Sequence, residues 1–156
     1  MDFERREILQ AGGRLGAIAV AVAAGILKPA AAHAQQWNKG AFDSRNFADT
    51  LKALGGPGTP SNKDIQITAP DIAENGAVVP VTAESKFAKT QMIAIIVEKN
   101  PYPLIAQFDI PEGTDPFVAT RVKMAETSNV YVLVKADGKY HHAVREVKVT
   151  LGGCGG

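Results

Sequence analysis

A succession of short strand-like segments between residues 65 and 151 restricts the fold of this chain more than any other feature. In most of them apolar and polar side chains alternate, as in strands with one buried face. The clearest alternating segments are residues 104–110, 118–124 and 130–134. Residues 92–97 instead form an almost continuous apolar run, which is typical of a central strand buried on both faces. Because no helical pattern separates these segments, we expect a mostly β, antiparallel sandwich.

One helix is expected before the strands, over residues 41–54. Its apolar residues recur at spacings that bring them to one helical face. They are Phe42, Phe47, Leu51 and Leu54. The sequence Gly55-Gly56-Pro57 then ends the pattern, since glycine favours a helix end and proline cannot continue the helix.

Turn signals divide the rest of the body. Asn75-Gly76 is a strong turn sequence, and Asp137-Gly138 predicts a two-residue hairpin between the last two strands. The Cys…Trp…Cys pattern of antibody domains is absent, because the chain has one cysteine. We find no internal repeat, so residues 35–151 are predicted to form one domain.

The first 34 residues have the pattern of an export signal. Arg5 and Arg6 precede an apolar pair, which resembles a twin-arginine signal, and Ala32-His33-Ala34 matches a small-x-small cleavage site. The apolar run at 15–27 is shorter than the roughly 20 residues that a membrane-spanning helix needs. We therefore expect residues 1–34 to be cleaved and the mature protein to be periplasmic, without a membrane anchor; a retained anchor is the alternative.

The charge of the predicted mature chain excludes some partners. The full sequence has 17 lysine and arginine residues and 16 aspartate and glutamate residues. Removal of residues 1–34 takes away four basic and three acidic residues, which leaves a formally neutral chain with no long run of one sign. Nucleic acids and anionic membranes bind basic surfaces, so neither is the expected main partner.

Residues suited to catalysis or metal binding are few. His141 and His142 are adjacent on an expected strand, so their side chains point to opposite faces and cannot form one site. Glu112 and Asp115 lie in a loop whose Gly-Thr sequence indicates a turn. We therefore predict no catalytic residue, no metal site and no cofactor in this chain.

The single cysteine, Cys154, has two glycines on each side: Gly152, Gly153, Gly155 and Gly156. Glycine does not restrict the backbone, so residues 152–156 are predicted to form a flexible arm. From Leu151 the arm carries Cys154 at most roughly 10 Å, at about 3.3–3.6 Å per residue. An unpaired cysteine in an exported protein indicates an intermolecular disulfide or a reactive thiol.

The sequence Leu151-Gly152-Gly153-Cys154-Gly155-Gly156 resembles the C-terminal arm of SoxY, the sulfur-carrier subunit of the bacterial thiosulfate-oxidising Sox system. The signal, the N-terminal helix and the β body extend the resemblance over the whole chain. It implies an immunoglobulin-like fold, a tight heterodimer with SoxZ and covalent attachment of the sulfur substrate to Cys154. It also implies that separate enzymes act on that sulfur: a haem enzyme that attaches thiosulfate, a hydrolase that releases sulfate and a sulfur dehydrogenase.

Two other functions remain open from the residues. Ubiquitin-like sulfur carriers also end in Gly-Gly and hold sulfur on the terminal carboxylate, here that of Gly156. However, export would separate the chain from ATP, and no helix is expected between the strands. The other alternative is an exported β-sandwich binding module in which Cys154 forms only an intermolecular disulfide.

Overall fold

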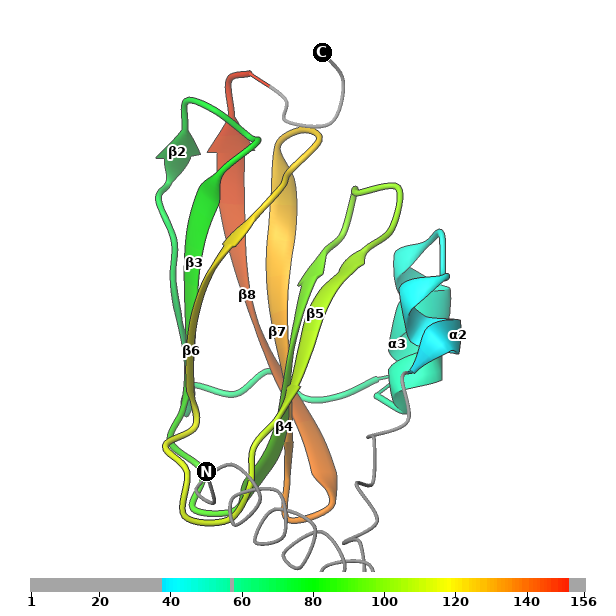
Figure 1. Cartoon of the computed structure of the whole chain (residues 1–156), viewed down its shortest axis with the longest axis vertical. Helices are drawn as coiled ribbons and strands as arrows, with labels where there is room; N and C mark the ends of the chain where they lie inside the picture. The colour runs from blue at the N-terminus through cyan, green and yellow to red at the C-terminus, as the bar shows by residue number, and fades with distance from the viewer. Residues whose placement is uncertain (1–37, 57, 152–156) are drawn as a thin grey trace, which may run out of the picture. The chain divides into compact units, whose positions relative to one another are not determined.

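The computed structural model describes residues 38–56 and 58–151 of this 156-residue chain. In this part, two short helices precede eight strands, and the strands form two facing sheets (Figure 1). The helices are α2 (Lys39–Phe42) and α3 (Phe47–Leu54). The strands are β1 (Ile65–Thr68), β2 (Ile72–Ala73), β3 (Val79–Ser85), β4 (Thr90–Val97), β5 (Leu104–Asp109), β6 (Phe117–Val122), β7 (Ser128–Ala136) and β8 (Lys139–Val149). The mostly β sandwich with helical structure at its N-terminal side is confirmed.

The smaller sheet has the order β1-β3-β6, and the larger has the order β2-β8-β7-β4-β5. Every paired strand is antiparallel to its neighbour except β2, which runs parallel to β8. The expectation of a purely antiparallel fold is wrong at this one short strand. The chain crosses from β1 to β2 within residues 69–71 and does not reverse, so β2 keeps the direction of β1, which is also that of β8.

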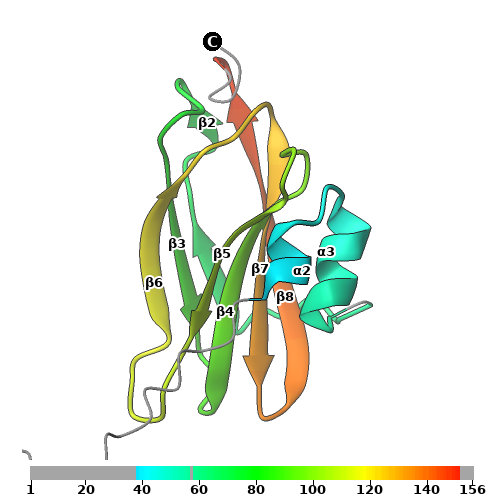
Figure 2. The same cartoon turned by 45° about the vertical axis from the view of Figure 1, so that its right-hand side comes forward.

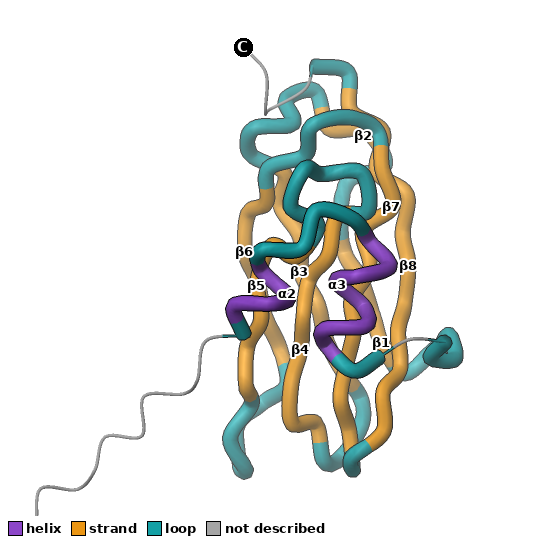
Figure 3. The backbone as a smooth tube through the Cα atoms, turned by 90° about the vertical axis from the view of Figure 1, so that its right-hand side faces the viewer, coloured by secondary structure: helices purple, strands orange, loops and turns teal. Residues whose placement is uncertain are grey.

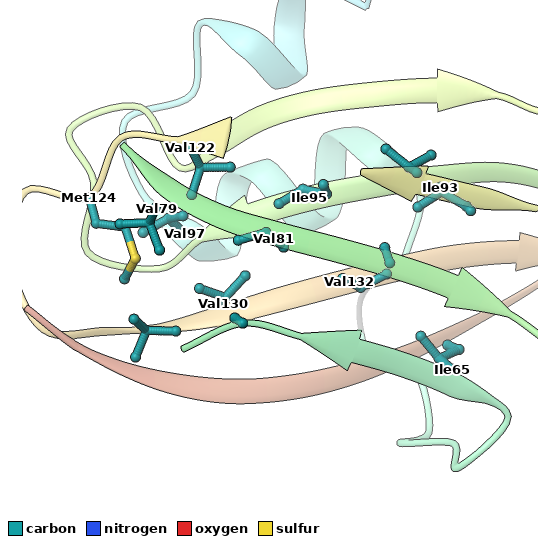
Figure 4. Packing of buried hydrophobic residues seen from close by; sticks show 14 of the residues in the cluster. Ile65, Val79, Val81, Ile93, Ile95, Val97, Val122, Met124, Val130 and Val132 are labelled. Carbon is teal, nitrogen blue, oxygen red and sulfur yellow. The ribbon is translucent and has the colours of Figure 1, made fainter. Parts of the chain in front are cut away.

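Strand β4 is buried on both faces, as its continuous apolar sequence predicts. Ile93, Ile95 and Val97 belong to the core between the two sheets, and each is fully buried. Figure 4 shows these three side chains among valines from β3 and β6 of the facing sheet and from the neighbouring strand β7. Met92, Ala94 and Ile96 alternate with them and belong to a second cluster on the other face. Burial of each large side chain contributes about 1.5–3 kcal/mol, so the double burial anchors the sandwich.

The helices form a third layer on the outer face of the larger sheet (Figures 2 and 3). The predicted apolar face is confirmed, since all four residues pack in the second cluster; they are Phe42, Phe47, Leu51 and Leu54. The expected single helix over 41–54 is instead two helices. Asn46 has an extended backbone, with φ −144°, and its side chain accepts a hydrogen bond from Asp49 N at 2.8 Å. This N-cap starts a new helix at Phe47.

Two predicted turns depend on residues with positive φ. Asp137 and Gly138 have φ values of 48° and 74° and join β7 to β8, so the expected two-residue hairpin is confirmed. Gly55 ends α3 with φ 80°, and a Cβ atom there would lie 3.2 Å from Tyr140 Oη. Glycine at this position therefore satisfies both the backbone conformation and the close packing of the helix layer on β8.

The two ends of the sandwich carry different loops. Strand β8 finishes at the end where Leu151 lies, and we call it the exit end (Figure 1). The β2–β3, β4–β5 and β6–β7 connections are also at the exit end, whereas the β3–β4, β5–β6 and β7–β8 connections are at the opposite end. Among the described residues, no helix is long and apolar enough to span a membrane.

Candidate functional site

The predicted attachment residue Cys154 and its glycines Gly152, Gly153, Gly155 and Gly156 lie outside the described residues. The structure shows where the segment that carries them begins. Leu151 is the last described residue, and 66% of it is exposed. The segment therefore starts at the protein surface, at the exit end.

Thr150 and Leu151, which we call the arm root, are bound to the segment around β2. The Thr150 amide donates a hydrogen bond to Ala73 O at 3.1 Å, and Leu151 O accepts one from Gly76 N at 2.7 Å. The Thr150 hydroxyl donates to Glu74 O at 3.0 Å. Three hydrogen bonds within two residues hold the arm root against the segment around β2.

The β6–β7 connection is also hydrogen-bonded to the segments that form the arm root. Met124 N donates to Gly76 O at 2.7 Å, and Val149 N donates to Thr127 Oγ1 at 2.9 Å. Met124 is fully buried in the core between the sheets. The arm root is thus connected through backbone hydrogen bonds to a core residue, and it forms part of the rigid body of the sandwich.

Asn100 holds two loops of the exit end together. Its side chain donates from Nδ2 to Lys123 O at 2.7 Å and accepts from Ala125 N at 3.0 Å. The residue is only 7% exposed. Sequence reasoning missed it, because an asparagine before Pro101 has the composition of an ordinary turn. Nothing in the local sequence distinguishes an asparagine that bonds a distant loop from one that bonds its own turn.

The two histidines are separated by the sheet, as predicted. His141 faces the sandwich side and stacks on Phe87, with ring centroids 4.6 Å apart. His142 faces the helix side, where its Nδ1 lies 3.0 Å from Thr59 Oγ1 and its ring is 5.9 Å from that of Tyr131. Burial first, and then the Glu98 carboxylate, raise the pKa of Tyr131 above the usual value of a tyrosine. His141 therefore belongs to the packing between the two sheets, and His142 and Tyr131 belong to the packing between the larger sheet and the helices.

Glu112 and Asp115, the acidic residues considered from the sequence, lie in a turn. Glu112 and Asp115 are exposed in the β5–β6 connection, where Gly113 has φ 80° and Thr114 N donates to Pro111 O. The turn interpretation of this loop is confirmed. In the described part of the chain, no three histidine, cysteine, aspartate or glutamate residues are grouped closely enough to hold a metal ion.

A shallow depression of roughly 260 Å³ lies at the end of the sandwich opposite the arm root. It is lined by the β3–β4 turn and by the β7–β8 hairpin; the residues are Phe87, Ala88, Lys89, Ala136, Asp137, Lys139 and His141. Lys89 Nζ lies 3.8 Å from Asp137 Oδ1 across it. Because the sandwich separates this depression from the arm root, we do not assign it to the same site.

Residues 51–154 match a protein-family model described as "Sulfur oxidation protein SoxY". The matched range includes the arm root and continues through Cys154. No curated protein matches the sequence significantly.

One similar solved structure is the sulfur carrier protein SoxY from Chlorobium limicola f thiosulfatophilum, which is 43% identical over 66% of this chain and 96% of that chain, with a TM-score of 0.58. Another is a superoxide reductase (neelaredoxin) from Ignicoccus hospitalis, which is 16% identical over 55% of this chain and 79% of that one, with a TM-score of 0.49. The second likeness is too weak to support a functional conclusion.

Proposed function

Because the chain belongs to the SoxY family of sulfur oxidation proteins, we propose that it is a sulfur carrier of thiosulfate oxidation that holds its substrate covalently on Cys154. The observation that carries this proposal is the family match, which includes the only cysteine of the chain. The carrier is not itself an enzyme: its thiol binds the sulfur, and other proteins supply the catalytic groups.

The arrangement of the exit end supports this role. A carrier thiol must be mounted on a stable body and must leave that body at the surface. The hydrogen bonds of Thr150 and Leu151 attach the end of β8 to the body, and the exposed Leu151 places that end at the surface. The glycines on both sides of Cys154 keep the segment narrow, which suits entry into a cleft of another protein.

The proposed partners follow from family membership. They are SoxZ as a tight heterodimer partner, and the thiosulfate-attaching haem enzyme, the sulfate-releasing hydrolase and the sulfur dehydrogenase as transient partners. A formally neutral body fits protein partners better than it fits nucleic acid or an anionic membrane. Co-purification from cells that express both chains tests the heterodimer, and isolation of a stable monomer from such cells would contradict it.

The attachment site is tested by mass spectrometry of the protein isolated from cells that oxidise thiosulfate, first intact and then by fragmentation of its C-terminal peptide. We expect a sulfur-containing mass increase on the peptide that contains Cys154, and we expect a reductant to remove it, since a thiolate cleaves bonds between two sulfur atoms. An adduct on the Gly156 carboxylate would instead identify a thiocarboxylate carrier. A Cys154–Cys154 dimer that never exchanges in mild reductant would identify a disulfide-linked binding module.

We also propose that the protein is periplasmic and is exported by the twin-arginine route, with residues 1–34 removed. Replacing Arg5 and Arg6 together by lysine is expected to leave the uncleaved precursor in the cytoplasm, because the signal resembles one that is read through its arginine pair. Cell fractionation and N-terminal sequencing check this result, with Arg14→Lys as the control that retains the pair. Normal export of the double variant would exclude the twin-arginine route.

A further inference from the structure

The shallow depression at the end of the sandwich opposite the arm root lies between two turns. One wall is the β3–β4 turn, with Phe87, Ala88 and Lys89, and the other wall is the β7–β8 hairpin. Because β3 belongs to the smaller sheet and β7 and β8 to the larger, the depression lies where the two sheets end together (Figure 1). Its volume of roughly 260 Å³ is below that of pockets which bury drug-sized ligands, so it suits a small molecule.

Hydrogen bonds hold both walls of the depression in place. The Thr90 hydroxyl donates to Phe87 O at 3.1 Å, and Phe87 N donates to Ser85 Oγ at 3.3 Å. The Ser85 and Thr90 hydroxyl oxygens lie 2.7 Å apart, and both residues are buried. Asp137 N of the hairpin donates to Lys89 O of the turn at 3.1 Å. A ligand therefore meets a preformed surface and does not have to order it on binding.

His141 brings a ring with an unsatisfied nitrogen to the depression. The ring stacks on Phe87, and its Nδ1 atom is fully buried without a hydrogen-bond partner among the described residues. A buried N–H without a partner is rarer in proteins than a buried acceptor without one, so the neutral imidazole carries its proton on Nε2. Nε2 is not fully buried. It is therefore the ring nitrogen that can donate a hydrogen bond to a ligand.

The side chains that line the depression carry one net positive charge. Lys89 Nζ lies 3.8 Å from Asp137 Oδ1, so these two charges largely compensate each other. Lys139 is exposed and forms no ion pair within the described part of the chain. It lies two residues before His141 on β8, so both side chains are on the same face of the strand. Lys139 and His141 thus offer two neighbouring donors to an anion with a single charge.

The remaining lining of the depression is apolar. It consists of Phe87, Ala88 and Ala136, and Phe87 packs against the core between the sheets, to which Ala136 belongs. Sulfate, with two negative charges and no apolar surface, matches neither the single net charge nor this lining. A carboxylate on a small apolar group matches both, because its oxygens accept from Lys139 and His141 while its carbon atoms cover Phe87 and the alanines.

We propose that this depression is a binding site for a small organic carboxylate, held by Lys139 and His141 against the apolar surface of Phe87. The Lys139 ammonium balances the charge of the ligand, and His141 Nε2 donates to one carboxylate oxygen. Because Lys139 is exposed, the ion pair contributes little, and we expect a Kd on the order of 1 mM. The site uses no group of the arm and does not depend on the proposed role of Cys154.

The test titrates sodium benzoate into the carrier isolated in its exported form and follows the backbone amides by NMR. We expect saturable shifts at the β3–β4 turn and at the β7–β8 hairpin. Benzyl alcohol has the same ring without the charge, and sulfate has charge without the ring, so neither is expected to saturate at concentrations that saturate benzoate. Equal or tighter binding of either compound would overturn the proposal, as would a lack of saturable shifts with benzoate.

Two substitutions test the two donors separately. His141→Phe keeps an aromatic ring beside Phe87 and removes both ring nitrogens, including the buried unpaired one, so we expect it to fold. Loss of the Nε2 donor is expected to raise the Kd for benzoate roughly tenfold. Lys139→Gln is expected to raise the Kd about fivefold, because it removes one exposed ion pair. Since Lys139 is exposed, this variant tests the site even if His141→Phe does not fold.

The matched control is Lys135→Gln. It removes the same charge from the neighbouring strand β7, where Lys135 lies over the Tyr140 ring on the helix side of the larger sheet. We expect its Kd for benzoate to equal that of the parent protein. A rise equal to that in Lys139→Gln would show a general charge effect and overturn the proposal. If benzoate no longer binds when the proposed SoxZ chain is present, the depression belongs to that interface and the proposal is wrong.

Discussion

Cys154→Ser is expected to reduce thiosulfate-dependent sulfate formation to the background rate in a mixture of all partner proteins. Serine has an oxygen in place of the sulfur and cannot form the sulfur–sulfur bond that holds the substrate. The chain has no second cysteine that can replace it. Sulfate production over time, measured with wild-type carrier as reference, checks the result.

The same variant is expected to fold normally. The two apolar clusters of the described body are built without Cys154, so the free energy of unfolding should change by less than about 0.5 kcal/mol. Binding of the proposed partner chain should also persist. Substantial sulfate formation by Cys154→Ser protein would contradict the carrier role, whereas loss of folding would mean that the residue has a structural role.

Asn100→Ala is expected to lower the free energy of unfolding by about 2–3 kcal/mol. The substitution removes two hydrogen bonds that connect the β4–β5 and β6–β7 connections, and it leaves Lys123 O and Ala125 N without their side-chain partner. Because Asn100 is 7% exposed, alanine also leaves a space that the loops fill only in part. Denaturant unfolding followed by circular dichroism measures the change.

Asn75→Ala is the matched control at the same end of the sandwich. Asn75 is exposed, and its side chain accepts one local hydrogen bond, from Ala77 N at 2.8 Å. We expect a loss of about 0.5–1 kcal/mol, because water replaces much of what the exposed side chain provides. Equal losses in the two variants would show that the link between the loops contributes nothing beyond an ordinary turn.

Local patterns were sufficient for most of the fold. The continuous apolar sequence of residues 92–97 predicted a strand buried on both faces, because such a strand has no polar face to present to water. Asp137-Gly138 predicted its hairpin, because few other residue pairs adopt two positive φ values at low cost. The spacing of Phe47, Leu51 and Leu54 predicted a helical apolar face, although not the break at Asn46, where a capping residue outweighed the periodic pattern.

The attachment residue was also predicted from sequence, and it remains a prediction. A lone cysteine among glycines is recognisable without a fold, because both its chemistry and its backbone freedom are local properties. The family match includes the residue, and the described structure ends just before it. Sequence alone therefore determined the candidate group.

Only the tertiary structure decided how Thr150 and Leu151, at the end of the described chain, are held. Leu151 is far in the sequence from Ala73 and Gly76, and each of these residues has the pattern of an ordinary strand or turn residue. They meet because β2 crosses to the larger sheet and pairs with β8, and because the Asn75 turn binds Leu151. Asn100 likewise acts through a loop more than twenty residues away. Such contacts depend on which distant segments the fold brings together, and local periodicity in the sequence does not determine that.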